Sequence, residues 1–305
     1  MTEPTLPVYI IHWNAPEWCL SAVDSVLLSV GVEPYLTVVD NGSSPSAVCK
    51  LEASLPSQVR LLKSSQNLGF AGGANLCIDD ACASGTEWLV LAAHDVIVKP
   101  DCLWNLLETA KASPKFGALG PIFWNAEWTL PTSLGGLWDS SRGARHRNPF
   151  PGWERQKVLE ADWLHGALLL LRVDAVTALG GFSEPLFAYC EDVDLCLRLR
   201  DSGWTVGVVT RAHAREQGNA ASPLEHVYYI ARNSLILTRR RAGRWRMWRR
   251  AVRVAGYSLR AGVGSLLPWR SKERRASSRA FALGQARAVF DALRGCTGPR
   301  RGWHP

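Results

Sequence analysis

The densest cluster of reactive side chains in this sequence is Glu191-Asp192-Val193-Asp194, which places three carboxylates within four positions. Asp194 stands four residues before Arg198, so these two can pair on one face of a helix. Acids at a helix N-terminus offset the macrodipole by about 0.3–1 kcal/mol each, but three neighbouring like charges repel one another. We therefore interpret the cluster as functional. A carboxylate held near other carboxylates has a raised pKa, which suits a general base.

Two further acids, Asp40 and Asp95, are each the first charged residue after an apolar run. The runs cover residues 35–39 and 88–92 and are typical of strands. Acids after strands are also ordinary turn formers. In an open α/β sheet, however, ligands bind at the carboxyl ends of the strands. Two such acids in one sheet favour a ligand site over two unrelated turns.

A glycine-rich segment lies between these acids at residues 67–75, Asn-Leu-Gly-Phe-Ala-Gly-Gly-Ala-Asn. It is neither the G-x-G-x-x-G dinucleotide fingerprint nor a P-loop, which argues against a Rossmann dehydrogenase or a P-loop kinase. Glycines that open a helix still allow the backbone to approach a phosphate or a sugar closely.

The elements that must position these residues alternate along the chain. Apolar runs predict strands near residues 8–11, 35–39, 59–62 and 88–92, with helices between them over residues 17–30 and up to about residue 83. This alternation predicts an α/β fold with a mostly parallel sheet and helices on both faces. Beyond it we expect a long ordered loop over residues 123–162, strands over 163–171 and 204–209, and a helix from residue 228.

Composition is ordinary for a globular chain of 305 residues with 47% hydrophobic residues. The N-terminus is acidic and does not resemble a signal peptide, and the most apolar run, residues 167–171, is too short to span a bilayer. The eight cysteines have no Cys-x-x-Cys spacing, which favours reduced thiols in a cytoplasmic protein. We therefore expect a cytoplasmic location.

The charge is divided unevenly, which predicts a domain of residues 1–238 and a basic helical appendage of residues 239–305. The appendage carries 18 Lys/Arg and two acids, a net charge of +16, whereas the rest carries 17 bases and 25 acids, a net charge of −8. Its arginines alternate with aromatics, as in helices that lie on anionic membranes. A helix packed on the acidic body is the alternative, and nucleic-acid binding has no accompanying motif. We expect contact with the inner face of the cell membrane.

Four motifs in order resemble inverting glycosyltransferases of family 2 with the GT-A fold, close to the bacterial rhamnosyltransferase-like group. The resemblance extends from about Val8 to Leu237. The segments that carry it are residues 38–43, residues 67–75, residues 180–199 and Tyr228-Tyr229 with Arg232-Asn233.

The resemblance implies a role for each matching residue. Asp192 is implied as the base that deprotonates the acceptor hydroxyl, and Glu191 as a residue that orients the acceptor. Asp95 and His213 are implied as ligands of a divalent cation, Mg²⁺ or Mn²⁺. Donor contacts are implied for His12, Asn14, Asp40, Asn67, Gly69, Asn75 and Asp95, and acceptor contacts for Trp163, His165, Gly166 and Glu191. The partners are a dTDP- or UDP-sugar, rhamnose or another deoxysugar, and a glycan, lipid-linked or small-molecule acceptor.

The chain departs from the family at Ala93-His94-Asp95. The family usually has Asp or Asn two residues before the metal-binding acid, and here that residue is Ala93. His94 either takes over the role of that side chain or is a surface histidine. The departure leaves a second hypothesis, a non-catalytic sugar-nucleotide or glycan-binding module tethered by the basic segment.

Overall fold

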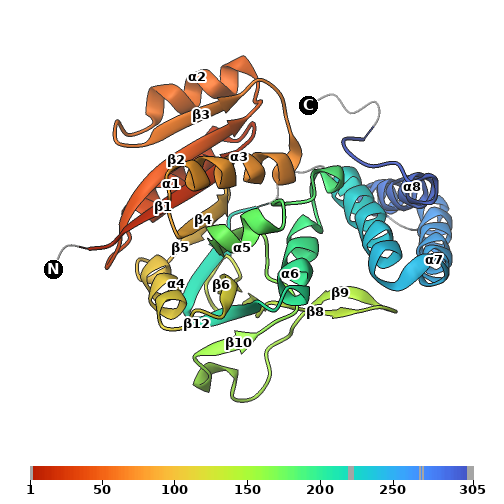
Figure 1. The fold of residues 1–305 in the computed structure, drawn as a ribbon. Helices are drawn as coiled ribbons and strands as arrows, with labels where there is room; N and C mark the ends of the chain where they lie inside the picture. The colour runs from red at the N-terminus through yellow and green to blue at the C-terminus, as the bar shows by residue number, and fades with distance from the viewer. Residues whose placement is uncertain (1–2, 219–222, 268, 270, 301–305) are drawn as a thin grey trace.

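The computed structural model describes residues 3–218, 223–267, 269 and 271–300. Its main sheet has the strand order β10-β12-β6-β11-β4-β1-β2-β3, with β5 on β12 and β7 on β6 (Figure 1). The strands are β1 (Thr5–His12), β2 (Glu33–Asn41), β3 (Arg60–Ser64), β4 (Trp88–Ala93), β5 (Val96–Val98), β6 (Phe116–Trp124), β7 (Pro131–Ser133), β10 (Val158–Glu160), β11 (Leu168–Arg172) and β12 (Thr205–Glu216). Strands β4, β1, β2 and β3 are parallel, as are β6 and β12, whereas β11 is antiparallel to β4 and β6.

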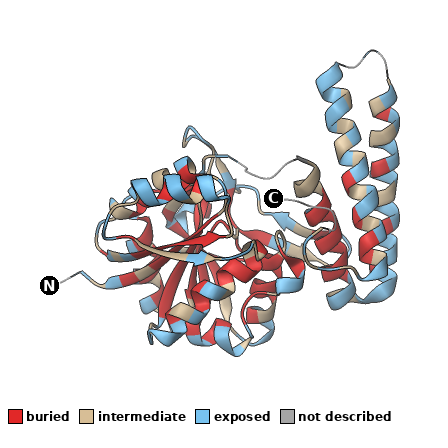
Figure 2. Ribbon diagram, turned by 90° about the horizontal axis from the view of Figure 1, so that it is seen from above, coloured by how far each residue is buried: buried red, intermediate tan, exposed pale blue. Residues whose placement is uncertain are grey.

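Helices cover both faces of the sheet (Figures 1 and 2), as the sequence predicts. They are α1 (Pro16–Leu27), α2 (Pro45–Ser54), α3 (Gly69–Ala83), α4 (Cys102–Lys111), α5 (Val173–Ala178) and α6 (Glu191–Asp201). Strand β1 separates two cores: Val8 and Ile10 pack with α1 and α4, whereas Tyr9 and Ile11 pack with α3, α5 and α6. A strand that is buried on both faces has a continuous apolar sequence, and the sequence of β1 therefore predicts a strand.

The parallel register aligns the carboxyl ends of the strands. His12 at the end of β1 pairs with Asp40 near the end of β2, and Ile11 pairs with Ala93 at the end of β4. Residues that follow these strands therefore meet at one edge of the sheet, where the candidate site lies.

Residues 123–162 are more regular than the predicted loop. They contain β7, β10, the 3-10 helix Trp153–Arg155 and a hairpin of β8 (Gly136–Asp139) and β9 (Gly143–His146). These strands are only three or four residues long, too short to give a periodic signal. The strand predicted over residues 163–171 begins only at Leu168, so its first five residues form the approach to the site.

Helix α4 and strand β6 were not expected. Strand β6 contains Gly117, Gly120 and Pro121, residues that ordinarily mark turns. Tight packing accounts for Gly117, because a Cβ atom there would lie 2.9 Å from Trp204.

The C-terminal part forms a helical arm that projects from the sheet domain (Figure 2). It consists of α7 (Pro223–Leu266), which bends at Gly243, and α8 (Lys272–Arg294), which packs along α7. Helix α7 crosses the predicted boundary between residues 238 and 239, and that boundary stays a prediction. In the described part of the chain, no helix is long and apolar enough to cross a membrane.

Candidate active site

A strained loop precedes the carboxylate cluster. Phe187, Tyr189 and Cys190 adopt left-handed backbone conformations, with φ of 67°, 66° and 67°. Each such conformation costs a non-glycine residue about 1–3 kcal/mol, so surrounding contacts must hold it. Cys190 is the N-cap residue of α6, and the loop therefore sets the direction of Glu191 and Asp192.

Helix α7 supplies the contacts that hold this loop. The buried Asn233 amide donates to the carbonyl oxygens of Leu186, Ala188 and Tyr189 at 2.7–2.8 Å. The Arg232 guanidinium, only 1% exposed, donates to the Leu186 carbonyl at 3.0 Å. Arg232 and Asn233, which belong to one of the segments that carry the resemblance, thus hold the loop that precedes Glu191.

Asp192 is fixed by two backbone amides. Its Oδ2 accepts from the Gly166 N–H at 2.9 Å and its Oδ1 from the Val193 N–H at 2.7 Å. Burial raises the pKa of Asp192, whereas nearby His165 and the two amides oppose that rise. A carboxylate with a raised pKa is a stronger base, and this one faces the cavity.

Gly166 is required for this geometry, because a Cβ atom there would lie 2.9 Å from the Asp192 Cβ. We expect Gly166→Ala to displace Asp192, the base that the resemblance implies, and to lower turnover by about 10²-fold, the scale of a 1 Å misplacement. Steady-state kinetics would measure this. Gly256→Ala is the control, because its Cβ would meet nothing within 4 Å. Equal turnover in both variants would contradict the role of Gly166.

Glu191 is a buried acid, and its Oε2 has no hydrogen-bond partner among the described residues. Burial, and then the neighbouring Asp192, raise its pKa well above the usual range. A protonated Glu191 can donate to, or accept from, an acceptor hydroxyl. Asp194 instead pairs with Arg198, Oδ2 to Nε at 2.8 Å, which confirms the predicted (i, i+4) pair.

Asp95 and Glu216 form a second pair of acids across the cavity. Burial, and then the Glu216 carboxylate, raise the pKa of Asp95 to about 7. The Glu216 side chain is 41% exposed at the cavity wall, and partial desolvation raises its pKa as well. A divalent cation would favour the ionised form of both groups, and hard oxygen ligands suit Mg²⁺ or Mn²⁺. The pair could supply two oxygen ligands to the implied metal, and the described residues contain no group of three or more metal-ligating side chains.

His213 does not reach this pair, which corrects the predicted ligand set. The His213 carbonyl bonds to Lys99, whereas the Asp95 carbonyl bonds to Gln217, four positions along the ladder. Because each strand residue advances about 3.3 Å, His213 and Asp95 lie roughly 13 Å apart along the strands. The His213 Nδ1 instead accepts from the Trp124 indole N–H at 2.9 Å. Glu216, the acid at the end of β12, is a candidate site residue that the sequence did not indicate.

His165 lies between the two pairs of acids. Its Nε2 is 3.7 Å from the Glu216 Oε2, and its ring packs on Phe123 at 4.4 Å and on His146 at 5.5 Å. Burial lowers the pKa of His165, although Asp192 opposes the shift. His94 is not the surface histidine that we considered. It lines the cavity, burial lowers its pKa to about 4, and its buried Nε2 has no partner among the described residues.

The predicted donor residues at the ends of β1 and β2 form a fixed frame. The buried His12 Nδ1 lies 2.9 Å from the Asp40 Oδ1, and the His12 Nε2 accepts from the Ala15 N–H. Burial raises the pKa of Asp40, but hydrogen bonds from His12 and Ser43 outweigh it and leave the pKa below its usual value. Neither side chain lines the main cavity. Asn14 lines a smaller cavity of about 260 Å³ beside α1 and α2.

The glycine-rich segment supports the loop that precedes Glu191 and Asp192. Asn41, which the sequence reading did not select, donates to the Gly69 carbonyl at 2.9 Å and accepts from the Leu68 N–H. A Cβ at Gly69 would lie 2.3 Å from the Phe187 carbonyl oxygen, so this glycine allows the helix and the loop to touch. Asn75, outside the cavity, bonds through its amide to the Phe182 backbone and to Glu184, which gives it a structural role.

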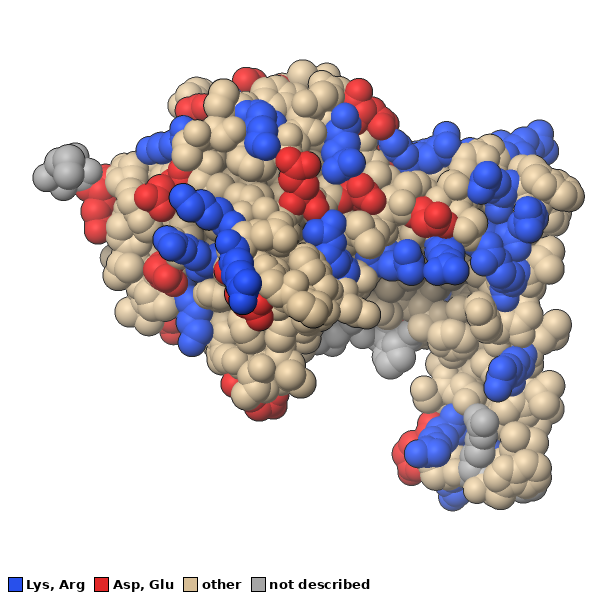
Figure 3. All heavy atoms as spheres, turned by 90° about the horizontal axis from the view of Figure 1, so that it is seen from below, with Lys and Arg blue, Asp and Glu red and all other residues tan. Residues whose placement is uncertain are grey.

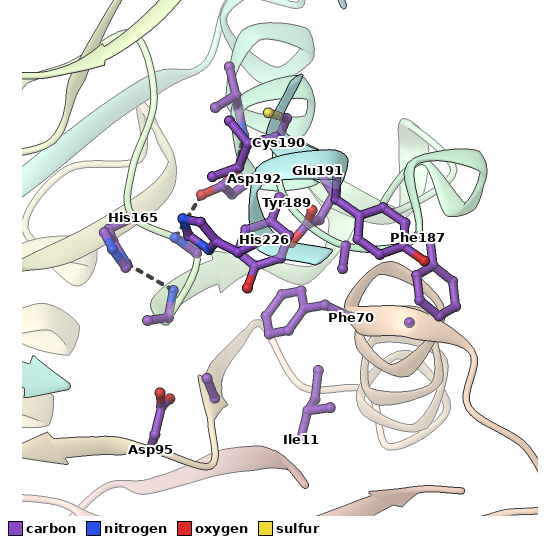
Figure 4. Close-up of a pocket in the computed structure, with 18 of the residues that line it drawn as sticks. Ile11, Phe70, Asp95, His165, Phe187, Tyr189, Cys190, Glu191, Asp192 and His226 are labelled. Carbon is purple, nitrogen blue, oxygen red and sulfur yellow. Dashed lines mark hydrogen bonds between the residues drawn. The ribbon is translucent and has the colours of Figure 1, made fainter. Parts of the chain in front are cut away.

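One cavity of about 600 Å³ collects most of the predicted site (Figure 4). Glu191 and Asp192 lie on one wall and Asp95 on the other. The predicted residues that line it are Asn67, Gly69, Asp95, Trp163, His165, Gly166, Glu191 and Asp192. His12, Asn14, Asp40, Asn75 and His213 lie outside its wall.

Comparison with known proteins shows the family. The family model described as glycosyltransferase like family 2 matches residues 4–247. An N-acetylglucosaminyl-diphospho-decaprenol L-rhamnosyltransferase of Mycobacterium tuberculosis is 31% identical over 313 residues, 94% of this chain and 100% of the relative. A galactofuranosyltransferase of the same organism is 28% identical over 212 residues, 68% of each chain.

Solved structures share the fold. The mannosyltransferase PcManGT from Pyrobaculum calidifontis, in complex with GDP-Man and Mn²⁺, superposes with a TM-score of 0.58 and 16% identity, over 96% of this chain and 88% of that one. GalNAc-T7, solved with UDP, GalNAc and Mn²⁺, superposes with a TM-score of 0.57 and 13% identity, over 97% of this chain and 58% of that one. On these sequence and fold matches, the chain belongs to glycosyltransferase family 2 and is a rhamnosyltransferase-like glycosyltransferase with a GT-A fold.

Proposed function

We propose that this enzyme transfers a deoxysugar, with inversion at C1, from a nucleoside-diphosphate donor to a hydroxyl of a lipid-linked glycan. The observation that carries the proposal is the placement of Glu191 and Asp192 across one cavity from Asp95. Glu216 lines the same cavity, and its charge acts on Asp95. A base on one wall and a diphosphate site on the other suit an in-line displacement. The rhamnosyltransferase relative, whose name includes L-rhamnose and a diphospho-decaprenol acceptor, supports rhamnose as the sugar and a polyprenyl-linked acceptor. A dTDP donor is the choice that the family resemblance implies.

The acceptor side of the reaction follows from the loop at α6. Asp192 takes the proton from the acceptor hydroxyl as that oxygen attacks C1 of the donor sugar. The bond between C1 and the phosphate oxygen breaks, and the nucleoside diphosphate leaves. Glu191 holds the acceptor hydroxyl through a hydrogen bond, while Gly166 and Val193 keep Asp192 aimed at it.

The donor side rests on the other wall. Asp95 and Glu216 would hold a divalent cation, which when bound neutralises charge on the leaving diphosphate. His94, whose neutral Nε2 can accept a hydrogen bond, would bind a donor hydroxyl, a role that the methyl side chain of Ala93 cannot fill. The nucleoside would lie toward Asn14, beside the His12–Asp40 frame.

We expect dTDP binding to require a cation held by Asp95 and Glu216. By titration calorimetry with Mn²⁺, Asp95→Asn and Glu216→Gln should each weaken dTDP binding at least about tenfold, since each removes a charged oxygen ligand. His213→Gln is the matched control and should bind as the wild type does. Binding unchanged by EDTA, or equal losses in all three variants, would contradict the metal assignment.

The non-catalytic alternative predicts donor binding without turnover. Release of nucleotide from dTDP-rhamnose in the presence of a polyprenyl-diphosphate-linked N-acetylglucosamine acceptor separates the two functions. The family assignment and the intact Glu191-Asp192 pair favour catalysis. A cytoplasmic location, with membrane contact through the basic appendage, stays part of this proposal.

A further inference from the structure

Helix α7 carries an apolar stripe that the fold leaves on the surface. Its members are Trp245, Trp248, Val252, Leu259, Val263 and Leu266, which are between 47% and 78% exposed. Their spacings of three, four, seven, four and three residues keep them on one face of a helix. Trp269, 77% exposed, follows the end of α7 and extends this surface. We call these seven residues the α7 stripe.

The α7 stripe is not the face that α7 uses to pack within the protein. Met247 and Ala251 are 3% and 2% exposed and lie in the core cluster of the sheet domain. Farther along, the buried Ser258 hydroxyl donates to the Ala282 carbonyl of α8 at 2.7 Å. The helix is therefore already anchored by its other face. An exposed apolar surface of this length marks an interaction site.

Basic side chains accompany the α7 stripe. Arg244, Arg249 and Arg260 are exposed on the same helix, and the sequence has no acid between Glu225 and Glu273. Figure 3 shows basic side chains grouped on the arm and on its junction with the body. The surface is thus apolar along its centre and positive at its edges.

Other arginines of α7 have a different role, because they bind the body. Arg241 pairs with Asp201 and Arg240 with Asp194, while Arg246 and Arg253 donate to Ser140 and Ser141. These contacts fix the base of the arm. The exposed arginines beside the α7 stripe are additional to this docking and face outward.

We propose that the α7 stripe is a docking surface for a bilayer containing anionic phospholipids, with α7 lying in the headgroup region. Interfacial helices of this kind combine tryptophan and aliphatic residues with flanking arginines. Each basic residue near an anionic leaflet contributes about 1 kcal/mol. A second copy of this chain is the less favourable occupant, since its own stripe carries the same positive edges.

This surface adds to the proposed function the means by which the enzyme meets its acceptor, and that consequence rests on the proposed function. Asn233, which holds the loop before Glu191, and Trp245 lie on the two sides of the bend at Gly243. They are twelve residues apart, so the helical rise on each side of the bend limits their separation to roughly 20 Å. A bilayer along the α7 stripe would therefore lie close to the cavity. A sugar acceptor anchored in that bilayer could reach Glu191 and Asp192 without leaving it.

The test is sedimentation of the full-length protein with vesicles of phosphatidylglycerol and phosphatidylcholine in equal parts. We expect binding that high salt weakens and that vesicles of phosphatidylcholine alone support poorly. The triple variant Leu259→Gln, Val263→Gln, Leu266→Gln should bind at least about tenfold more weakly, because it removes the apolar contact. The triple variant Arg244→Glu, Arg249→Glu, Arg260→Glu should lose the preference for phosphatidylglycerol.

The matched control is Leu28→Gln, Val30→Gln, Leu130→Gln, three residues of the sheet domain that are 55–69% exposed. It should bind vesicles as the wild type does. All three triple variants should keep wild-type turnover with a short-chain, water-soluble acceptor, and the two α7 variants should fall below the wild type only with a long-chain acceptor in vesicles. Failure of the wild type to turn over either acceptor would instead count against the proposed function.

Three results would overturn the docking proposal. The stripe variant, Leu259→Gln with Val263→Gln and Leu266→Gln, could sediment with vesicles as the wild type does. The control variant could lose as much binding as the stripe variant. Analytical ultracentrifugation could show that the wild type is a dimer that the stripe variant splits while vesicle binding is unchanged. This last result would assign the surface to a second copy of the chain.

Discussion

Asp192→Asn is expected to lower turnover by about 10²–10⁴-fold, the contribution of a positioned general base. The amide can still accept from the Gly166 N–H, so the loop should keep its geometry, but it cannot take the acceptor proton. Donor binding should be preserved, because Asp192 lies on the wall opposite Asp95. Steady-state kinetics, with calorimetric binding of dTDP alongside, measures both effects.

Asp201→Asn is the matched control. It makes the same chemical change at the other end of α6, where Asp201 is 60% exposed and pairs with Arg241. Wild-type turnover is expected. If Asp192→Asn kept most of the activity, or if the two variants lost equal amounts, another group would be the base.

The pH profile of the wild type gives an independent signature of the same residue. Because burial raises the pKa of Asp192, its carboxyl stays protonated to a higher pH than an ordinary aspartate. A protonated carboxyl cannot act as the base. Activity should therefore rise with pH through the raised pKa and level off above it, and the residual activity of Asp192→Asn should lack this limb.

Asn233→Ala is expected to lower kcat by about 10²-fold, the scale of a 1 Å misplacement. The substitution removes the amide donor from the carbonyl oxygens of Leu186, Ala188 and Tyr189. The free energy of unfolding should fall by about 1–3 kcal/mol, the cost of leaving a buried acceptor unsatisfied. Kinetics and thermal unfolding of the same preparation measure the two effects.

Asn105→Ala controls for the loss of an amide. Asn105, on α4, donates to the Arg211 carbonyl and lies away from the cavity wall. Its substitution should change stability without changing kcat. A loss of stability in Asn233→Ala with kcat unchanged would show that the loop keeps its conformation without this side chain, and the positioning role would be wrong.

Local chemistry made several features predictable from the sequence. The Asp194–Arg198 pair needs only the helical spacing of four residues. Strand β1 and its neighbours are buried on both faces, so their sequences are continuous apolar runs that end where the polar residues begin. The carboxyl ends of these strands, and therefore the position of Asp95 in the cavity, follow from that pattern.

The choice between His213 and Glu216 could not be made from sequence. The two residues lie three apart on β12, so they point to opposite faces of the strand. Which of the two side chains faces the cavity depends on the register irregularity between Val209 and His213. That irregularity arises from the pairing of β12 with β6, which the local sequence does not reveal. The strained loop was also hidden, because the left-handed residues Phe187, Tyr189 and Cys190 have no local signature and are held by α7.

The structure supports packing on the body for part of the basic appendage, and membrane contact stays a proposal. Packing on the acidic body accounts for Arg240 and Arg241, which pair with Asp194 and Asp201. It does not account for the α7 stripe, which faces away from that packing. Charge counts could not separate these groups, since the division depends on which side of one helix each arginine occupies.

The central claim is that one base and a departing nucleoside diphosphate act on opposite faces of the donor sugar. The most direct test is the anomeric configuration of the product, measured by NMR after turnover of dTDP-rhamnose with a polyprenyl-linked acceptor. We expect the configuration at C1 to be opposite to that of the donor. A product that retains the donor configuration would require a covalent intermediate or front-face attack, and it would contradict the role assigned to Asp192.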